Sequence, residues 1–273
     1  MIDLCTVVFR DEIETLRTQA RSVCLYCNDI GIRSIYVVVN DNDTVAQQID
    51  PAWWGAFQNL VRIVPRSIYS STWVENGWVS QQVLKLITSA VSNNSWCMIL
   101  DAKSFFIKKI DLDKIMCDGR PQVGSLDIYP VFKRSQEIAE KLFGISLESQ
   151  LGPGGVPFLV HTATVRAMIA EIEQRTCKNF ASWFQDQGML TEFILYSAYL
   201  KYKHGGFDRL YHPDFKLTNV NVCHSEVAVF DQKLSAMFAP DTLSVSVHRN
   251  AWTQLLPAQQ QQYLDFLKQR GIV

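Results

Sequence analysis

Short runs of branched apolar residues, each ending abruptly in polar ones, recur in the first hundred residues of this chain. Residues 2–9 (IDLCTVVF), 34–40 (SIYVVVN) and 96–100 (WCMIL) have the composition of strands buried in a sheet. Between the first two runs, apolar residues recur at helical spacing up to Gly31, which we expect to end that helix. A strand, a helix and a strand in succession predict a parallel pair, and therefore an α/β fold.

The same patterns predict the remaining elements. The stretch 78–91 (WVSQQVLKLITSAV) places its apolar residues on one face, which indicates an amphipathic helix. Residues 190–202 are apolar nearly all round, so a helix there should be buried. Further strands are expected at 60–64, 123–129, 157–161 and 243–247, and further helices at 137–143, 162–174 and 257–270.

Composition limits what kind of protein this is. With 273 residues, 48% of them hydrophobic, and with no repeat or long linker, the chain can bury one large core. Lys and Arg total 26 against 27 acids, so the net field offers no broad reason to bind nucleic acid. No apolar run reaches the roughly 18 residues of a membrane span, and the N-terminus lacks a signal peptide's basic flank. We expect a cytoplasmic protein without a transmembrane segment; peripheral contact with a membrane stays open.

The seven cysteines are scattered and odd in number, so they cannot all pair internally. We expect them to be thiols in a reducing compartment. Cys24 and Cys27 form a CxxC pair, yet no second close pair of Cys or His completes a zinc site. The sequence therefore predicts no zinc centre.

The run WCMIL ends in Asp101, followed by Ala102 and Lys103. In an open α/β sheet the carboxyl ends of the strands face the crevice that binds ligands, so Asp101 is a candidate site residue. The plainer alternative is that Asp101 caps a turn and Lys103 is solvated. No GxGxxG follows the first strand and no GxxxxGK[ST] occurs, which disfavours a Rossmann dehydrogenase and a P-loop enzyme.

Glycosyltransferases of the GT-A fold carry a metal-binding DxD motif at the end of a strand, about a hundred residues into the chain and after several β/α units. Asp101 stands at such a position, and here the motif reads DAK. The segments GWVSQQVLKL before this strand, TEFILYSAYL at 191–200 and VHRNAW at 247–252 together resemble a family of uncharacterised bacterial and phage glycosyltransferase-like proteins. The resemblance implies a GT-A-like α/β domain. Residues of about 1–120 would bind a nucleotide-sugar donor, and residues of about 121–273 a glycan or other hydroxyl acceptor.

Two hypotheses follow for the altered DxD motif. Asp101, helped by His248, holds a Mn or Mg ion on the donor, because these ions prefer hard oxygen ligands. Alternatively Asp101 orients the donor sugar or ribose while Lys103 contacts the diphosphate, and no metal is needed. We favour the second, because Lys103 replaces the second carboxylate. His248 follows the strand at 243–247, and the resemblance implies that it contacts a metal or phosphate; the alternative is a histidine with a structural role.

The resemblance also implies further donor-binding residues. The helix that begins near Gly77 is expected to pass beside the donor, where glutamine amides bond sugar hydroxyls and a lysine meets phosphate. Helical spacing places Gln81 and Lys85 on one face, and Gln82 elsewhere. On this helix, the residues assigned to the donor are Trp78, Gln81, Gln82 and Lys85. At the end of the first strand, where the fold usually receives the nucleotide base, they are Phe9, Arg10 and Asp11.

On the acceptor side, Glu192 lies near the start of an apolar helix. Its carboxylate therefore needs stabilising partners, the helix N-terminus or a functional cavity. The resemblance places it where an acid faces the acceptor and deprotonates the attacking hydroxyl. The alternative is helix capping, for which Thr191 also qualifies. Gly154 and Gly155 permit close backbone approach to the acceptor, although a tight turn explains them equally well.

We therefore expect a glycosyltransferase in which Asp101 and Glu192 are the catalytic residues. Retention or inversion of the sugar's configuration is open, since inversion needs Glu192 as base. A non-catalytic sugar-nucleotide or glycan-binding protein with a degenerate site is the competing class. A nucleotidyltransferase ranks low, because the first strand is not followed by a glycine-rich, basic loop.

Overall fold

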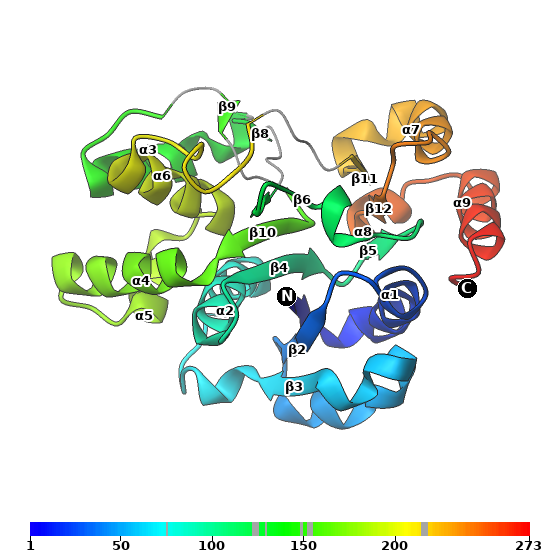
Figure 1. Cartoon of the computed structure of the whole chain (residues 1–273), viewed down its shortest axis with the longest axis horizontal. Helices are drawn as coiled ribbons and strands as arrows, with labels where there is room; N and C mark the ends of the chain where they lie inside the picture. The colour runs from blue at the N-terminus through cyan, green and yellow to red at the C-terminus, as the bar shows by residue number, and fades with distance from the viewer. Residues whose placement is uncertain (75, 122–125, 129, 148–149, 152–154, 214–217) are drawn as a thin grey trace.

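The fold, a computed structural model, is described for residues 1–273 except 75, 122–125, 129, 148–149, 152–154 and 214–217, and without the side chains of 126–127 and 150–151. Its central sheet has the strand order β10-β4-β1-β2-β3 (Figure 1). Strands β1 to β4 run parallel, and β10 pairs with β4 in the antiparallel sense. The strands are β1 Ile2–Val8, β2 Ile32–Val39, β3 Val61–Pro65, β4 Trp96–Asp101 and β10 Phe158–His161.

Helices cover both faces of this sheet, because side chains alternate across each strand. Along β1, Cys5 and Val7 belong to one buried apolar cluster, and Leu4 and Val8 belong to another. The second cluster includes α1, Ile13–Tyr26. The helices that contribute to the first cluster are α2 Gly77–Val91, α3 Lys133–Phe143, α4 Thr162–Thr176, α5 Phe180–Gln187 and α6 Glu192–His204.

A smaller sheet joins the middle of the chain to its last third. Strand β12 pairs in parallel with β11 and antiparallel with β5, the short strand just after Asp101. Its apolar side chains pack with α7, α8 and α9 in a third cluster. The bounds are β5 Ser104–Phe106, β11 Asn219–Val222, β12 Ser244–Val247, α7 Phe230–Met237, α8 Arg249–Trp252 and α9 Pro257–Gln269.

Short elements complete the described part of the chain. Two small hairpins pair β6 with β7 and β8 with β9. Their bounds are β6 Met116–Cys117, β7 Arg120–Pro121, β8 Leu126–Asp127 and β9 Gln150–Leu151. The 3₁₀ helices are η1 Arg10–Glu12, η2 Asp43–Gln48, η3 Pro51–Leu60, η4 Arg66–Ile68, η5 Leu112–Lys114, η6 Pro130–Phe132 and η7 His224–Val229.

Most of the predicted elements are confirmed within a few residues, including the parallel pair β1 and β2. One boundary is wrong: α1 ends at Tyr26 and does not continue to Gly31. The carbonyl of Tyr26 accepts a hydrogen bond of 2.7 Å from the N–H of Ile110, which diverts the chain from the helix. Of the strand expected at 123–129, residues 126–127 form strand β8 and residue 128 lies just beyond it; residues 123–125 and 129 lie outside the described residues.

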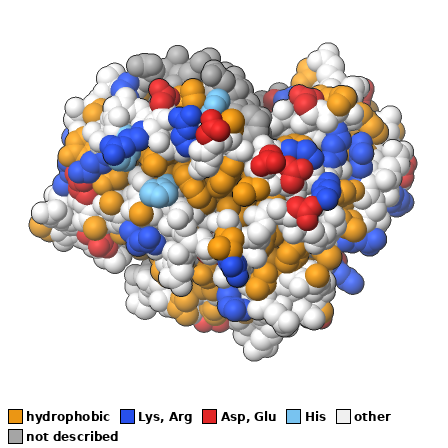
Figure 2. Space-filling model, viewed as in Figure 1, with side chains coloured by type: hydrophobic (Ala, Val, Ile, Leu, Met, Phe, Trp, Pro, Cys, Tyr) orange, Lys and Arg blue, Asp and Glu red, His pale blue; other side chains and the backbone are white. Residues whose placement is uncertain are grey.

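The surface agrees with the near-zero net charge. On the face shown in Figure 2, basic and acidic side chains are interspersed rather than gathered by sign. Among the helices that the structure describes, none is long and apolar enough to cross a membrane. All seven cysteines are free thiols, as predicted.

Candidate active site

Asp101 is the last residue of β4, at the carboxyl edge of the parallel strands. Gln19 of α1 fixes the turn that follows. Its amide nitrogen donates to the carbonyls of Asp101, at 2.5 Å, and Ser104, at 3.1 Å. The backbone of the turn is therefore held by a buried side chain from another element. The Asp101 carboxylate is left to bind other groups.

That carboxylate lies between two lysines and does not act as the turn cap considered above. Lys85 of α2 approaches Asp101 Oδ1 at 2.7 Å, and Lys103 approaches Oδ2 at 2.8 Å. Lys85 also contacts Glu192 Oε1, at 2.8 Å. We call Lys103, Asp101, Lys85 and Glu192, in this spatial order, the charge chain. Its charges alternate in sign and sum to zero.

The inner half of the charge chain is withdrawn from water. Lys85 is 3% exposed and Glu192 is 1% exposed, and a buried charge is tolerated when it is paired and hydrogen-bonded. Glu192 opens α6 after Thr191, whose hydroxyl lies 3.3 Å from that of Ser135 and makes no capping hydrogen bond. Glu192 thus has the partner that its position in an apolar helix requires.

The charges stabilise one another's ionised forms. Burial opposes ionisation of Asp101, but Lys103 and Lys85 outweigh it and hold the pKa of this carboxyl far below its usual range. Burial likewise opposes the charge on Lys85, but Asp101 and Glu192 outweigh it and raise the pKa of Lys85 well above its usual value. Lys85 is thus a fixed positive charge at neutral pH, and Asp101 a fixed negative one.

Both glutamines of α2 enter the site. Gln81 Nε2 donates to Asp101 Oδ1 at 3.4 Å. The amide of Gln82 lies against the Glu192 carboxylate, to which it donates when its nitrogen faces that group. The prediction that Gln82 points elsewhere is wrong. Because Lys85 of the same helix holds the two carboxylates close together, the neighbouring glutamines of α2 each reach one of them.

The residues that end β1 lie nearer the surface. Arg10 pairs with Asp41 at 3.2 Å, and Asp11 pairs with Arg249 of α8 at 2.9 Å. Phe9 packs so closely on Gly77 that a Cβ atom there would lie 2.6 Å from the ring. Trp78, the next residue, is 37% exposed and is free to contact a ligand.

His248 caps α8. Its Nδ1 accepts a hydrogen bond of 3.3 Å from the N–H of Asn250, so in the neutral ring the hydrogen lies on Nε2. Burial lowers the pKa of His248, and the charge of Lys103 lowers it further against the opposing effect of Asp101. The ring is therefore neutral at pH 7, with an Nε2–H group that donates and does not ligate a metal.

This donor set does not suit Mn or Mg. Both oxygens of Asp101 already bind ammonium groups, and His248 presents a hydrogen-bond donor. A divalent cation at this place would lie against two lysine charges. Lys103, at 16% exposure of its side chain, is the more accessible of these two lysines.

A pocket of about 410 Å³ opens beside Lys103. It lies between η1 and α1 on one side and α8 and α9 on the other. Asp11, Glu12 and Trp252 line it, together with Tyr263, whose buried hydroxyl has no hydrogen-bond partner in the described part of the chain. The pocket thus brings acidic and aromatic side chains together beside Lys103.

The site contains residues that the sequence did not single out. Arg249, Trp252 and Tyr263 come from the last thirty residues, and no spacing in the sequence ties them to β4. Gln19 could have been recognised from the sequence, because it is a polar residue at helical spacing from Leu16 and Val23, on the face of the helix that is buried.

The structure describes only part of the predicted acceptor loop. Gly154 lies outside the described residues. Gly155 is exposed, has φ of 77°, and precedes β10, which agrees with the alternative that it makes a tight turn.

The chain was compared with known proteins. No curated protein matches it. Among solved structures, the galactosyltransferase LgtC in complex with donor and acceptor sugar analogs has a TM-score of 0.51 at 12% identity, over 99% of this chain and 100% of that one. An active-site mutant of LgtC has the same score and identity, over 98% of this chain and 95% of that one.

At this identity the likeness concerns the fold, which is that of the GT-A glycosyltransferases, as predicted. A family model covers nearly the whole sequence. Residues 4–271 match the family described as "Family of unknown function (DUF6492)", and the chain belongs to that family.

Proposed function

We propose that this protein transfers a sugar from a nucleotide-sugar donor to a hydroxyl group of a glycan or related acceptor. The observation that carries the proposal is the charge chain, which sets a fixed carboxylate and an accessible lysine at the carboxyl edge of a GT-A sheet. The LgtC structure that shares this fold contains donor and acceptor sugar analogs. The position of Asp101 at the carboxyl end of β4 supports the proposal, because open α/β sheets bind ligands at that edge.

In this proposal Lys103 stabilises the departing diphosphate without a metal ion. Transfer builds negative charge on the leaving phosphate, and a preorganised ammonium group stabilises it. The Nε2–H group of His248 and the guanidinium of Arg249 are two further donors near Lys103. Gln81 and Asp101 then bind hydroxyls of the donor sugar or ribose.

The pocket of about 410 Å³ is proposed as the nucleoside site. Trp252 offers a ring on which a base can stack, and Tyr263 adds a second aromatic side chain to the lining. Asp11 and Glu12 supply carboxylates that accept hydrogen bonds from ribose hydroxyls.

Glu192 is proposed to contact the acceptor hydroxyl, at the inner end of the charge chain. If it removes the hydroxyl proton, the reaction inverts the anomeric centre; if the leaving phosphate does so, the configuration is retained. NMR of the product's anomeric proton decides between these courses. A retained anomer would remove Glu192 from the role of base.

The first experiment is a thermal-shift panel of UDP, GDP, CMP, dTDP and their common sugars, each with manganese or with EDTA. A shift for one nucleotide that survives EDTA is expected. A shift seen only with manganese would contradict the metal-independent site.

The second experiment measures transfer with the nucleotide found in that panel. Asp101→Asn, which keeps the shape of the side chain, is expected to lower kcat/KM by about 100-fold or more. Asp29→Asn, in an exposed ion pair with Lys109, is the matched control. Binding without transfer or hydrolysis by the wild-type protein would favour the non-catalytic alternative.

A further inference from the structure

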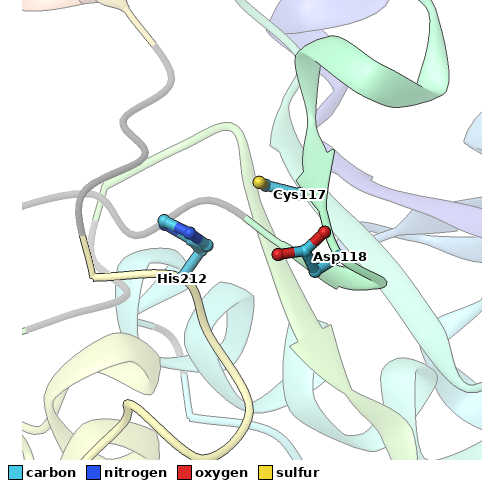
Figure 3. Close-up of side chains that lie close together, drawn as sticks. All are labelled: Cys117, Asp118 and His212. Atoms are coloured by element: carbon cyan, nitrogen blue, oxygen red, sulfur yellow. The ribbon is translucent and has the colours of Figure 1, made fainter.

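A second group of chemically reactive side chains lies outside the charge chain. Cys117, Asp118 and His212 each offer one ligand atom, and these atoms all lie within 4.8 Å of one another. Figure 3 shows Cys117 and Asp118 on one strand and its turn, with His212 facing them from another segment. It is the one such group of three in the described residues, and the spacing of Cys and His in the sequence gave no sign of it.

The hairpin of β6 and β7 determines how two of these side chains are presented. Cys117 pairs with Arg120, and the two residues between them make the turn. Asp118 has φ of 51° and Gly119 has φ of 74°, the backbone of a tight hairpin turn with an Asp-Gly sequence. The thiol and the carboxylate are therefore held on adjacent residues of a constrained hairpin.

Backbone contacts fix His212 beside that hairpin. Its N–H donates to the carbonyl of Pro121 at 2.9 Å, and Arg120 reaches the carbonyl of Asp208 at 3.1 Å. The preceding residue, Tyr211, is fully buried, and its hydroxyl donates to the carbonyl of Leu159 at 2.7 Å. A main-chain hydrogen bond and a side-chain contact thus join the two segments and hold His212 beside the hairpin.

We propose that Cys117, Asp118 and His212 bind a thiophilic divalent cation of the zinc type, with water in the fourth position. Sulfur, imidazole and carboxylate ligands together suit zinc and disfavour magnesium and calcium, which take oxygen ligands. Cys117 and His212 are half-buried and Asp118 is exposed, so the ion has a path of entry. Binding releases the thiol proton of Cys117.

Such an ion ties the hairpin to the segment that follows α6. The ligands are 95 positions apart along the chain at their widest, from Cys117 to His212, so the ion closes a long loop. An ion that binds the folded chain more tightly than the unfolded one stabilises the fold. The proposal concerns a different place and a different ion class from the donor site, so it stands whether or not the protein transfers sugar.

Cobalt(II) titration of the chelator-treated full chain tests the proposal. One equivalent is expected to produce a sulfur-to-cobalt charge-transfer band in the near ultraviolet, and zinc is expected to abolish it. Cys117→Ser should remove the band, and His212→Gln should weaken cobalt binding by about tenfold or more. The exposed Cys177→Ser is the matched control and should leave both unchanged.

Asp118→Asn covers the case in which the other variants do not fold, because this residue is exposed; it should also weaken cobalt binding by about tenfold or more. Absence of the band in the wild-type protein would overturn the proposal. Equal loss of the band in Cys177→Ser would overturn it as well.

Discussion

Lys85 of α2 and Glu192 of α6 lie 107 positions apart in the sequence and form a buried ion pair of 2.8 Å. The same ammonium group binds Asp101 at the end of β4. One lysine thus fixes a strand end and a helix start with respect to each other. Without it, Glu192 would lose this cation and Asp101 would keep only its contact with Lys103, so loss of this lysine would leave buried negative charge uncompensated.

Replacing Lys85 should therefore destabilise the fold strongly. Lys85→Met keeps most of the apolar stem but leaves Asp101 without its inner partner and Glu192 without its cation. Loss of one member of a buried ion pair costs about 3–5 kcal/mol. Urea unfolding at pH 7 measures the change.

Lys109→Met is the matched control, since Lys109 pairs with Asp29 at the surface, where both side chains are largely exposed. Its free energy of unfolding should stay close to that of the wild-type protein. Equal effects of the two substitutions would mean that Lys85 is not held in a buried ion pair.

Gln19→Met tests how the turn after β4 is held. The substitution keeps the volume but removes the donor for the carbonyls of Asp101 and Ser104. Leaving buried acceptors unsatisfied should cost about 1–3 kcal/mol in the free energy of unfolding. The exposed Gln47→Met is the control, and no difference between the two variants in urea unfolding would contradict the assigned role.

Lys103→Gln tests the cation that replaces the second acid of the DxD motif. The change removes the accessible charge next to Asp101 and keeps a polar side chain. In a transfer assay kcat should fall by about 100-fold, because the departing diphosphate loses its ammonium partner. Restoration of activity by manganese in this variant alone would indicate that the lysine does stand in for a metal.

Lys109→Gln is the control for that assay and should transfer sugar at the wild-type rate, since Lys109 pairs with Asp29 at the surface. An unchanged rate in Lys103→Gln would place the diphosphate elsewhere.

The pH dependence of stability should reveal a separate network on α4. Burial opposes ionisation of Glu171, but hydrogen bonds from Lys203, Arg175 and Tyr202 outweigh it and lower its pKa to about 2. Because this pKa lies below the value of about 4.3 in the unfolded chain, the network stabilises the fold above that pH. Its contribution is lost as the pH falls toward about 2.

The measurement is the difference in free energy of unfolding between the wild-type protein and Glu171→Gln. About 1 kcal/mol is expected at pH 7, since the network is partly exposed, and the difference should shrink steadily below about pH 4.5. Glu137→Gln, in an exposed pair with Arg134, is the control. A difference that grows on acidification would contradict the assignment.

The strands and the ligand-binding edge could be predicted because they depend on local pattern. The position of Asp101 at the ligand-binding edge could be predicted from the apolar run before it and from the common direction of the parallel strands. The side of α2 on which Gln82 acts could not be predicted, because it depends on where α6 packs. The meeting of Cys117 with His212 depends on backbone hydrogen bonds between segments far apart in the sequence.

The end of α1 shows the same limit. Helical spacing continues past Tyr26, yet a hydrogen bond from Ile110 ends the helix there. Propensity and periodicity describe what a segment can do alone, and a tertiary contact decides where it stops.

The pairing of β5 with β12 has a consequence for synthesis on the ribosome. The pocket beside Lys103 takes one wall from η1 and α1 and the other from α8 and α9, so its two walls come from segments far apart in the sequence and the second is translated well after the first. A nascent chain that has completed the central parallel strands still lacks half of that pocket. The growing polypeptide should therefore gain affinity for a ligand of this pocket only after residues near 263 have left the exit tunnel.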